Sequence, residues 1–560
     1  MNVAEELTLR VLGALLREDV LGLRTTSVPA QRSDGTWLRT GTLAVPVTAD
    51  GFQSEYTARL PLLEVEGTQV TELSEILGRL GELADPEDRA GYAAFAEECH
   101  QTLTTMRLHA AAQDEVHSAL AKCYGDDPAD WTGLGGSLAF DALAAYLDHP
   151  VYPTARGRSG LDDGQLRAYA PEFHPSFELR WLAVPEDALT VHGIAPLPTW
   201  WPTVDQLGLG GLKGPRLTIP VHPLTARAAL DALPGAVLAE RPYLEVVPTL
   251  SMRTVAVVQD PSCHLKLPLA TATLGLRNRR TIKPGTLVDG AAGQRLLEAV
   301  IAREPRFAER VLLADEQCYA HAGHELLAVL ARRYPAGLQD AVTVPLAALP
   351  ATAPGGRLVI DHLADRFYDG SPVRLYEELL DLLLDWQTTL FGYGIALESH
   401  QQNTSLVLDR VAGRTRLRLL YKDNDGPRIN PARLKELSCF QGEFDDPRTF
   451  GEGDRALTDL FTTITGHLCT ASLAFALAAH GRAPLAETLG LLRTRLGTAI
   501  DRLGPDGDPL RRALLDADRL PVKAMVTAGS LLSKERSGAA DINKHYTTGP
   551  NYLRQPGVPR

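Results

Sequence analysis

A short polar cluster between an apolar helix and a predicted hairpin constrains the fold of this chain more than any other feature. Apolar residues at helical spacing share one face and predict a helix that ends at Gly392 and Gly394: Leu375, Leu379, Leu382, Leu383, Trp386 and Leu390. The cluster Glu398–Asn403 follows at once and holds a carboxylate, an imidazole and three amides. Burying such groups costs free energy unless they have partners. The pattern therefore favours a binding or catalytic site here.

The residues after the cluster predict a β-hairpin. Ser405–Leu408 and Thr415–Tyr421 read as strands, and the second strand alternates apolar residues with arginines. If the hairpin is centred on Val411–Ala412, its open end brings His400 opposite Asp423, which joins two polar clusters into one site. The alternative is an exposed hairpin end whose polar groups are hydrated.

Composition limits the classes of protein. The chain has 560 residues, of which 44% are hydrophobic and 22% charged, and its formal net charge is −13. An acidic chain argues against a nucleic-acid partner. No apolar run reaches membrane-spanning length, and Met1–Glu6 lacks the basic start of a signal peptide, so we expect a cytoplasmic protein without a membrane partner. The six cysteines form no CxxC pair, which argues against a disulfide framework or a cysteine–zinc site.

The order of patterns predicts an α+β chain of two or three domains. Residues 1–148 read as mainly helical, with a strand-rich interruption near Thr40–Leu63, and residues 149–300 read as β-rich. Residues 301–560 read as mainly helical around a 395–430 hairpin, and the tail after Ser537 reads as loop. The middle strands are expected at Leu217–Val221, Leu244–Val247, Arg253–Val258 and His264–Ala270.

Two further polar segments suggest anion binding. The loop from His149 to Gly160 combines rigid prolines, glycines and two arginines, Arg156 and Arg158, which suits phosphate. A surface loop with hydrated arginines is the alternative. The sequence has no GxxxxGK[ST] loop, so a P-loop enzyme is not expected.

The second segment is a predicted hairpin with a turn at Gln259–Ser262. It places Ser251, Arg253 and Lys266 on one face unless the register slips by one residue. Arg277, Arg279 and Arg280 follow closely. Cations in an apolar region need an anionic partner, which is either a carboxylate elsewhere in the core or a bound phosphate or carboxylate. A hydrated basic turn remains the alternative.

In this order the segments resemble the siderophore synthetases that act independently of nonribosomal peptide synthetases, of the aerobactin-synthetase type. The resemblance covers roughly residues 149–430 and extends to Val522-Lys523-Ala524. It rests on the following motifs: His149-Pro with Pro153-Thr154, Val221-His222-Pro223, Ser251-x-Arg253-Thr254, Lys266-Leu-Pro, Gly394-Ile-Ala-Leu-Glu398-x-His400-x-Gln402-Asn403 and Asp423-x-x-Gly426.

This resemblance implies a three-lobed cupped-hand architecture (thumb, fingers and palm) and a homodimer. It implies ATP and Mg²⁺ as cofactors and a citrate-like carboxylate as substrate. The carboxylate would be adenylated, and an amine or hydroxyl co-substrate would then displace AMP to give an amide or ester. A kinase-like phosphotransferase and a non-enzymatic citrate- or siderophore-binding protein are the alternatives.

The resemblance also implies roles for single residues. His400, Arg277, Lys266 and Arg253 are expected to be catalytic, and Glu398 and Asp423 to hold the metal. Thr273, Arg277 and His400 are expected to hold the substrate carboxylate, although Arg279 or Arg280 could replace Arg277. The expected ATP contacts are His149, Thr154, Arg156, Ser251, Arg253, Thr254, Lys266, Gln402 and Asn403. Three positions depart from the usual pattern: Tyr152 and Arg156 replace a histidine and a lysine, and Lys422 replaces an arginine.

Overall fold

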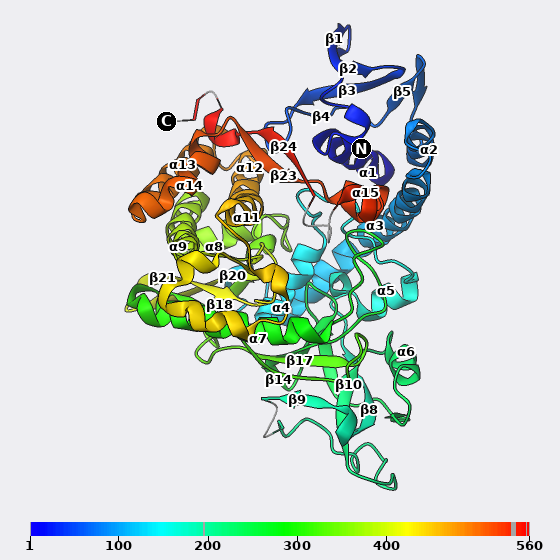
Figure 1. Cartoon of the computed structure of the whole chain (residues 1–560), viewed down its shortest axis with the longest axis vertical. Coiled ribbons are helices and arrows are strands. Elements are labelled where there is room, and N and C mark those ends of the chain that lie inside the picture. Colours follow the sequence, from blue (N-terminus) through cyan, green and yellow to red (C-terminus); the bar gives the residue numbers. More distant parts are fainter. Residues whose placement is uncertain (1, 194–196, 539–544, 556, 559–560) are drawn as a thin grey trace.

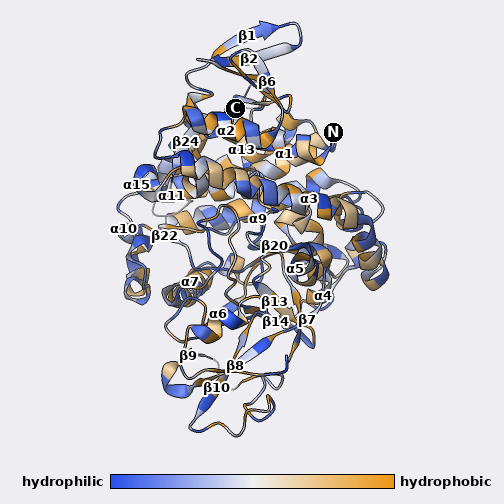
Figure 2. Ribbon diagram, turned by 90° about the vertical axis from the view of Figure 1, so that its right-hand side faces the viewer, coloured by the Kyte–Doolittle hydropathy of each residue, from blue (hydrophilic) through white to orange (hydrophobic). Residues whose placement is uncertain are grey.

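The computed structural model describes residues 2–193, 197–538, 545–555 and 557–558. Figure 1 shows the N-terminal helices and small sheet at the upper right, the C-terminal helices at the upper left and the β-rich middle part at the bottom. In Figure 2, apolar segments run through the helices and strands, whereas many outer loops are hydrophilic. Helices and strands are mixed along the chain, so the predicted α+β class is confirmed.

The N-terminal part combines helices with a small antiparallel sheet. Helix α1 (Val3–Arg17) begins at a capping box: the Asn2 side chain accepts hydrogen bonds from the backbone N–H groups of Ala4 and Glu5, and the Glu5 carboxylate accepts one from Asn2. The remaining elements are β1 (Val28–Arg32), β2 (Gly35–Thr40), β3 (Leu43–Ala49), β4 (Tyr56–Ala58), β5 (Leu63–Val65), β6 (Thr68–Val70), α2 (Leu73–Leu83), α3 (Arg89–Tyr124) and α4 (Gly133–Ala145).

The middle of the chain supplies a three-stranded sheet, β10-β8-β11, and most of a seven-stranded sheet with the order β7-β12-β13-β14-β17-β16-β9. The predicted middle strands overlap β10, β12, β13 and β14, but β14 begins at Asp260, inside the turn expected at Gln259–Ser262, and ends at Lys266 rather than Ala270. The elements are α5 (Asp163–Tyr169), β7 (Phe177–Glu178), β8 (Arg180–Pro185), β9 (Thr190–His192), β10 (Arg216–Val221), α6 (Ala226–Asp231), β11 (Val237–Leu238), β12 (Glu245–Pro248), β13 (Thr254–Val257) and β14 (Asp260–Lys266). The larger sheet takes two strands from beyond residue 300, so the boundary expected there runs through this sheet.

The C-terminal part is mainly helical around a four-stranded sheet with the order β15-β21-β20-β18. The predicted apolar helix is α9 (Pro372–Gly392), and Leu379, Leu382 and Trp386 on its predicted face are fully buried. The other helices are α7 (Pro284–Arg303), α8 (Val359–Phe367), α10 (Pro431–Leu434), α11 (Arg455–Leu460), α12 (Ser472–Ala479), α13 (Leu485–Asp501), α14 (Asp508–Leu510) and α15 (Lys534–Ser537). The strands are β15 (Val311–Leu313), β16 (Asp315–His321), β17 (Ala328–Arg333), β18 (Val342–Pro345), β19 (Ile395–Ala396), β20 (Thr404–Val411), β21 (Arg414–Tyr421), β22 (Arg428–Ile429), β23 (Arg519–Lys523) and β24 (Tyr546–Pro550).

The predicted hairpin exists as β20 and β21, but its register differs from the expectation. Val411 pairs with Arg414, so the turn is Ala412-Gly413. Both turn residues have positive φ, 49° and 77°, which is the backbone that two-residue hairpin turns prefer and that glycine adopts without strain. His400 therefore does not lie opposite Asp423 in the register. Instead, the Asn403 carbonyl accepts a hydrogen bond from the Lys422 N–H at 3.1 Å, which continues the ladder beyond the strands.

Two expectations about the C-terminal part need correction. The helical run Arg455–Ala479 is long and apolar enough to cross a membrane by length and composition, contrary to the expectation from the sequence. However, 83% of its most apolar window is buried inside the protein, which accounts for that composition. The tail predicted as loop contains β24, which pairs antiparallel with β23. Residues 539–544, 556 and 559–560 of that tail lie outside the described residues.

We predict that Gly293→Ala destabilises the protein whereas Gly290→Ala in the same helix does not. A Cβ at Gly293 would lie 2.4 Å from the Asn424 carbonyl oxygen, while a Cβ at Gly290 would make an ordinary contact at 3.6 Å from the Asp425 Cβ. Overpacking of this kind typically costs ~1–3 kcal/mol, whereas Gly→Ala in a helix interior gains ~1 kcal/mol. Thermal denaturation and hydrogen exchange of residues 421–426 measure both effects. Equal stabilisation by the two variants would contradict the close packing of α7 on this loop.

Candidate active site

One cavity of about 850 Å³ lies where the large sheet, the open end of the hairpin and the C-terminal helices meet. It is lined by most of the residues that the sequence singled out: His149, Arg156, Ser251, Arg253, Lys266, Thr273, Glu398, His400, Gln402, Asn403 and Asp423. Seven arginine or lysine side chains and four carboxylates line it. The cavity thus carries an excess of positive charge, although the whole chain has a net charge of −13.

An ion-pair network fixes the strand side of the cavity to the hairpin end. The Lys266 Nζ lies 2.6 Å from Asp423 Oδ1 and 3.3 Å from Asp425 Oδ2. Arg332 also donates to Asp423 Oδ1, at 2.7 Å, and its Nε donates to Glu316 Oε1 at 2.5 Å. Arg332 and Glu316 are each 2% exposed, so both are buried ions that need this pairing.

Sheet register explains why these cations converge. Arg332 on β17 pairs with His264 on β14, and Lys266 lies two residues further along β14. Because side chains alternate between faces, Arg332 and Lys266 project from the same face of the sheet. Of the two kinds of anionic partner that the sequence left open, Lys266 has carboxylates of the chain, because Asp423 and Asp425 reach it from the hairpin end.

Asp423 is held ionised by its surroundings. Burial alone would raise its pKa, but Lys266, Arg332 and Arg253 hold the pKa well below the ordinary value of an aspartate. The Glu316 carboxylate accepts hydrogen bonds from the backbone N–H groups of Asp423, at 2.7 Å, and Asn424, at 3.2 Å. These bonds fix a backbone with φ of 60° at Asp423, a conformation that non-glycine residues rarely adopt.

Arg253 and Arg280 differ from Lys266 because they form no ion pair with any carboxylate in the described ranges. Arg253 donates to the carbonyl oxygen of Thr281 at 2.8 Å, and both guanidinium groups line the cavity. Burial lowers the pKa of Arg253. Burial, followed by repulsion from Arg253, lowers the pKa of Arg280 to about 9, so Arg280 stays charged at neutral pH. Two neighbouring enclosed cations without a carboxylate partner indicate a site for an anion.

The polar loop Glu398–Asn403 is folded by its own hydrogen bonds. The His400 N–H donates to the Glu398 carbonyl at 2.8 Å, and the Gln402 N–H donates to His400 Nδ1 at 3.3 Å. Burial lowers the pKa of His400 to about 4, against the opposing effect of Asp423. The imidazole is therefore neutral at pH 7 and presents an uncharged polar group to the cavity.

The loop after α4 contributes a second histidine and an arginine. His149 Nδ1 accepts hydrogen bonds from the backbone N–H groups of Val151, at 3.3 Å, and Tyr152, at 3.1 Å. Burial lowers the pKa of His149 to about 3, so this imidazole is neutral as well. Arg156 already has a carboxylate partner, because its Nε and one terminal nitrogen donate to the two oxygens of Asp148 at 2.8 and 2.7 Å.

Three of the expected site residues do not line the cavity. Thr154 donates to Glu98 Oε1 at 2.5 Å, and Thr254 is a buried residue of β13 that pairs with Lys266. Arg277 points away and donates to the carbonyl oxygens of Ala528, at 3.3 Å, and Leu532. Arg277 is therefore the one expected catalytic residue that does not line the cavity, and Arg280 lines it instead.

Two glutamates of the N-terminal part, Glu18 directly after α1 and Glu98 on α3, hold the segment 523–531, which brings Lys523 to the cavity. Glu18 accepts hydrogen bonds from the backbone N–H groups of Val526, at 2.9 Å, and Thr527, at 2.8 Å. Glu98 accepts hydrogen bonds from Tyr152, at 3.0 Å, from Thr154 and from Ser530, at 2.9 Å. This contact joins the loop that carries His149 to the C-terminal segment.

Sequence reasoning missed Glu316, Arg332, Glu98 and Glu18. The available signal for Arg332 was a charged residue inside an apolar strand pattern, Leu330-Ala-Arg332. The glutamates lie on helical or strand faces whose burial only the three-dimensional packing reveals, so their positions gave no local signal.

Two models of protein families match separate segments of this chain. Residues 138–351 match the model of the IucA / IucC family, and residues 377–536 match the model described as ferric iron reductase FhuF-like transporter. The rhizobactin siderophore biosynthesis protein RhbC of Rhizobium meliloti (strain 1021) is 25% identical over 426 residues, which are 65% of this chain and 65% of that protein. The matched region thus spans just under two thirds of that relative.

A second relative and a solved structure are also similar to this chain. The L-2,3-diaminopropanoate–citrate ligase of Staphylococcus aureus (strain NCTC 8325 / PS 47) is 50% identical over 44 residues, 8% of each protein. The structure of ATP-bound aerobactin synthetase IucA from a hypervirulent pathotype of Klebsiella pneumoniae superposes with a TM-score of 0.70, covering 98% of this chain and 100% of that chain at 16% identity. The fold is thus shared with an aerobactin synthetase. The match of residues 138–351 to the IucA / IucC family model and the similarity to these proteins confirm the resemblance to siderophore synthetases of the aerobactin-synthetase type.

Proposed function

We propose that this chain adenylates a citrate-like carboxylate with ATP and condenses it with an amine or hydroxyl, releasing AMP and pyrophosphate, as a step of siderophore biosynthesis. The observation that carries the proposal is the cation excess of the cavity, with Arg253 and Arg280 lacking a carboxylate partner within the described ranges. A triphosphate beside a carboxylate supplies the missing negative charge. The similarity to a citrate ligase and to an ATP-bound synthetase supports the same substrates.

In this proposal the ATP phosphates bind Arg253, Lys266 and Arg280, with Ser251, Gln402 and Asn403 as uncharged hydrogen-bonding partners. Electrostatic stabilisation of the charge that develops in acyl transfer is often the largest contribution to such catalysis. Thr273 and Arg280 would hold the substrate carboxylate, with neutral His400 beside it as a hydrogen-bonding group. His149 lies at the cavity as a further uncharged partner, whereas Arg156 is already neutralised by Asp148.

The carboxylates fit a magnesium ion that is bound mainly through phosphate. Asp423 Oδ1 is taken by Lys266 and Arg332, while no donor among the described residues reaches its Oδ2. Glu398 and Asp425 line the same cavity, but the described residues form no group of three or more metal-binding side chains. Mg²⁺ commonly takes one or two protein carboxylates and completes its shell with phosphates and water. Glu398 and Asp423 are the proposed ligands, and the bound ion would offset phosphate charge.

The resemblance implies a homodimer and a cytoplasmic location, and both stay predictions. Thr154 and Thr254 leave the set of proposed ATP contacts, because their side chains do not line the cavity. Arg277 leaves the catalytic set for the same reason and is proposed to hold the segment 528–532 in place.

We predict that the purified protein releases pyrophosphate and AMP from Mg-ATP when citrate and an amine are supplied together. His400→Ala should reduce this release ~10²–10³-fold, the typical loss of a group that stabilises the reacting charge. His100→Ala, an exposed histidine of α3 that does not line the cavity, is the matched control. Formation of ADP would instead indicate phosphotransfer, and binding of citrate without turnover a binding protein. Either result, across a panel of carboxylates, would contradict the proposal.

We predict that Arg280→Ala and Arg277→Ala separate ligand binding from folding. A charge-assisted hydrogen bond is worth ~1.5–3 kcal/mol, so Arg280→Ala should raise the KM for ATP or citrate at least about tenfold. Its removal also relieves repulsion with Arg253, so the melting temperature of the ligand-free protein should hold or rise. Arg277→Ala should lower the melting temperature, because two carbonyl groups lose their donor.

The control for this pair is Arg279→Ala, whose side chain is 59% exposed and pairs with Glu325 at 3.5 Å. It should behave like the wild type. A large increase in KM for Arg277→Ala together with normal kinetics for Arg280→Ala would reverse the assignment of the two arginines.

We predict that His400 titrates near pH 4 in the ligand-free protein rather than near ~6.5, the value of an exposed histidine. NMR of protein labelled with ¹³C-histidine measures this pKa, and His400→Gln identifies the signal. Because the folded pKa lies below the unfolded one, the unfolded chain takes up this proton first. The contribution of His400 to folding stability therefore falls as the pH drops from ~6.5 towards ~4. A titration near ~6.5 would show that the imidazole is hydrated.

A further inference from the structure

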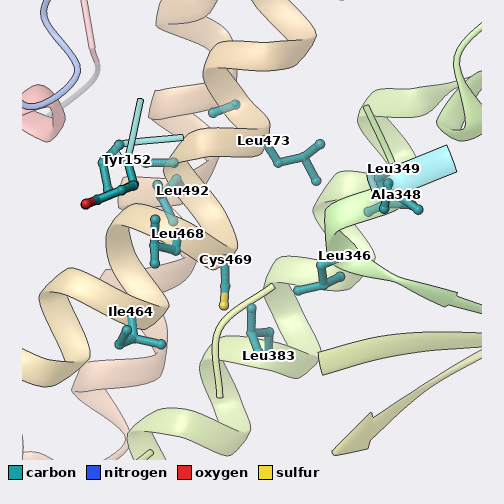
Figure 3. Packing of buried hydrophobic residues seen from close by; sticks show 14 of the residues in the cluster. Tyr152, Leu346, Ala348, Leu349, Leu383, Ile464, Leu468, Cys469, Leu473 and Leu492 are labelled. Carbon is teal, nitrogen blue, oxygen red and sulfur yellow. The ribbon is translucent and has the colours of Figure 1, made fainter. Parts of the chain in front are cut away.

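The cavity has a second wall that the proposed adenylation does not use. One helical run, formed by a π-helix at Phe461–Ala471 and by α12, supplies apolar lining residues: Ile464, Leu468, Cys469, Leu473, Phe475 and Ala476. Leu346, Ala347 and Pro350 line the cavity from the segment after β18. Figure 3 shows Ile464, Leu468, Cys469 and Leu473 along this run, with Leu346 on the neighbouring segment.

The wall carries no formal charge along most of its length. Among the described lining residues from Ile464 to His480, none is an aspartate, glutamate, lysine or arginine, and His480 is at the far end. The one hydroxyl, Ser472, donates to the Leu468 carbonyl at 2.6 Å. An adenine ring needs polar partners at its edge, which this wall does not provide. Its chemistry suits an uncharged carbon chain.

The polar loop lies between the two walls. On the cationic side, Lys266 contacts Asp423 at 2.6 Å. Lys422, which precedes Asp423 in the chain, donates its backbone N–H to the carbonyl oxygen of Asn403 in the loop. On the other side, the Cys469 thiol contacts the Ser399 carbonyl at 3.4 Å. From the cations to the apolar helix, the order is therefore Lys266, Asp423, the loop Glu398–Asn403, and Cys469. A second substrate that approaches this loop from the side opposite the phosphates meets the apolar wall.

We propose that one wall of the cavity binds the hydrocarbon part of the co-substrate; this inference rests on the proposed function. The wall is formed by Ile464, Leu468, Leu473 and Phe475, and the co-substrate is a primary amine or alcohol on an uncharged aliphatic chain. The nitrogen or oxygen of this chain forms a bond to the carbonyl carbon of the acyl-adenylate. The bond from that carbon to the phosphate oxygen breaks, AMP leaves with its electron pair, and the nucleophile gives up one proton to water.

Primary n-alkylamines from propylamine to heptylamine test this, with saturating Mg-ATP and citrate and the amide product measured by mass spectrometry. If each added methylene is buried on the wall, kcat/KM rises about fourfold per methylene, the equivalent of ~0.8 kcal/mol per CH₂. 6-Aminohexanoate, which ends in a carboxylate, should react more slowly than hexylamine. A flat dependence on chain length, or a preference for the carboxylated amine, overturns the proposal.

Leu473→Ala and Leu477→Ala form a matched pair in α12. Both leucines are buried, at 5% and 1% exposed, but only Leu473 lines the cavity. Leu473→Ala should lower kcat/KM for heptylamine about tenfold and for propylamine little, which corresponds to the loss of one or two buried methylenes. Leu477→Ala should leave the dependence on chain length unchanged even if it lowers the melting temperature. The same slope in both variants would overturn the assignment of the wall.

Citrate-dependent exchange of pyrophosphate into ATP, measured without any amine, separates this inference from the proposed function. We expect that Leu473→Ala leaves the KM for ATP in this exchange unchanged, because the wall does not hold the nucleotide. An increased KM for ATP would assign the wall to adenine and overturn the inference alone. If the wild type shows no exchange with any carboxylate tested, the proposed function fails and this inference fails with it.

Discussion

The ion pairs of Asp423 with Lys266 and Arg332 are the interaction on which the site depends. They connect β14 and β17 of the large sheet to the end of the hairpin, and Glu316 on β16 closes the network through the backbone of Asp423. Buried ions of this kind cost desolvation, so the network is favourable only while every member keeps its partner. It therefore specifies one relative position of sheet and hairpin, and the distance between the cations and the loop that carries His400 follows from it.

The cations of the cavity fall into two classes according to their partners. Lys266 and Arg156 pair with carboxylates of the chain and so help to hold the frame, although Lys266 also lines the cavity and is one of the proposed phosphate contacts. Arg253 and Arg280 have no such partner among the described residues and lie close enough together for Arg253 to disfavour the charge of Arg280. Sequence alone gives all four the same appearance. Only the partner of each cation distinguishes a residue that holds the fold from one that awaits an anion.

The sequence predicted local features well because they depend on neighbours along the chain. The apolar face of α9 and the strands β13, β14, β20 and β21 follow from periodicity, and the polar loop follows from its position after the helix. The hairpin register was missed because the turn chemistry of Ala412-Gly413, rather than the symmetry of the strands, sets it. The sequence could not show which of Arg277 and Arg280 lines the cavity. The two residues lie three positions apart on an irregular loop, where no periodic pattern indicates the direction of a side chain.

The remaining features arise from contacts between distant parts of the chain. Glu18, directly after α1, and Glu98 on α3 hold Val526, Thr527 and Ser530, although hundreds of residues separate them in sequence. Their carboxylates are buried, and burial raises the pKa of both, so their position is costly unless the hydrogen bonds they accept are kept. Those bonds join the loop of His149 and the segment of Lys523, which enter the cavity from different ends of the chain. The N-terminal helices thus act on the site without lining most of it. A change in the packing of these helices would displace both segments together, because Glu98 contacts the loop of His149 and also the C-terminal segment.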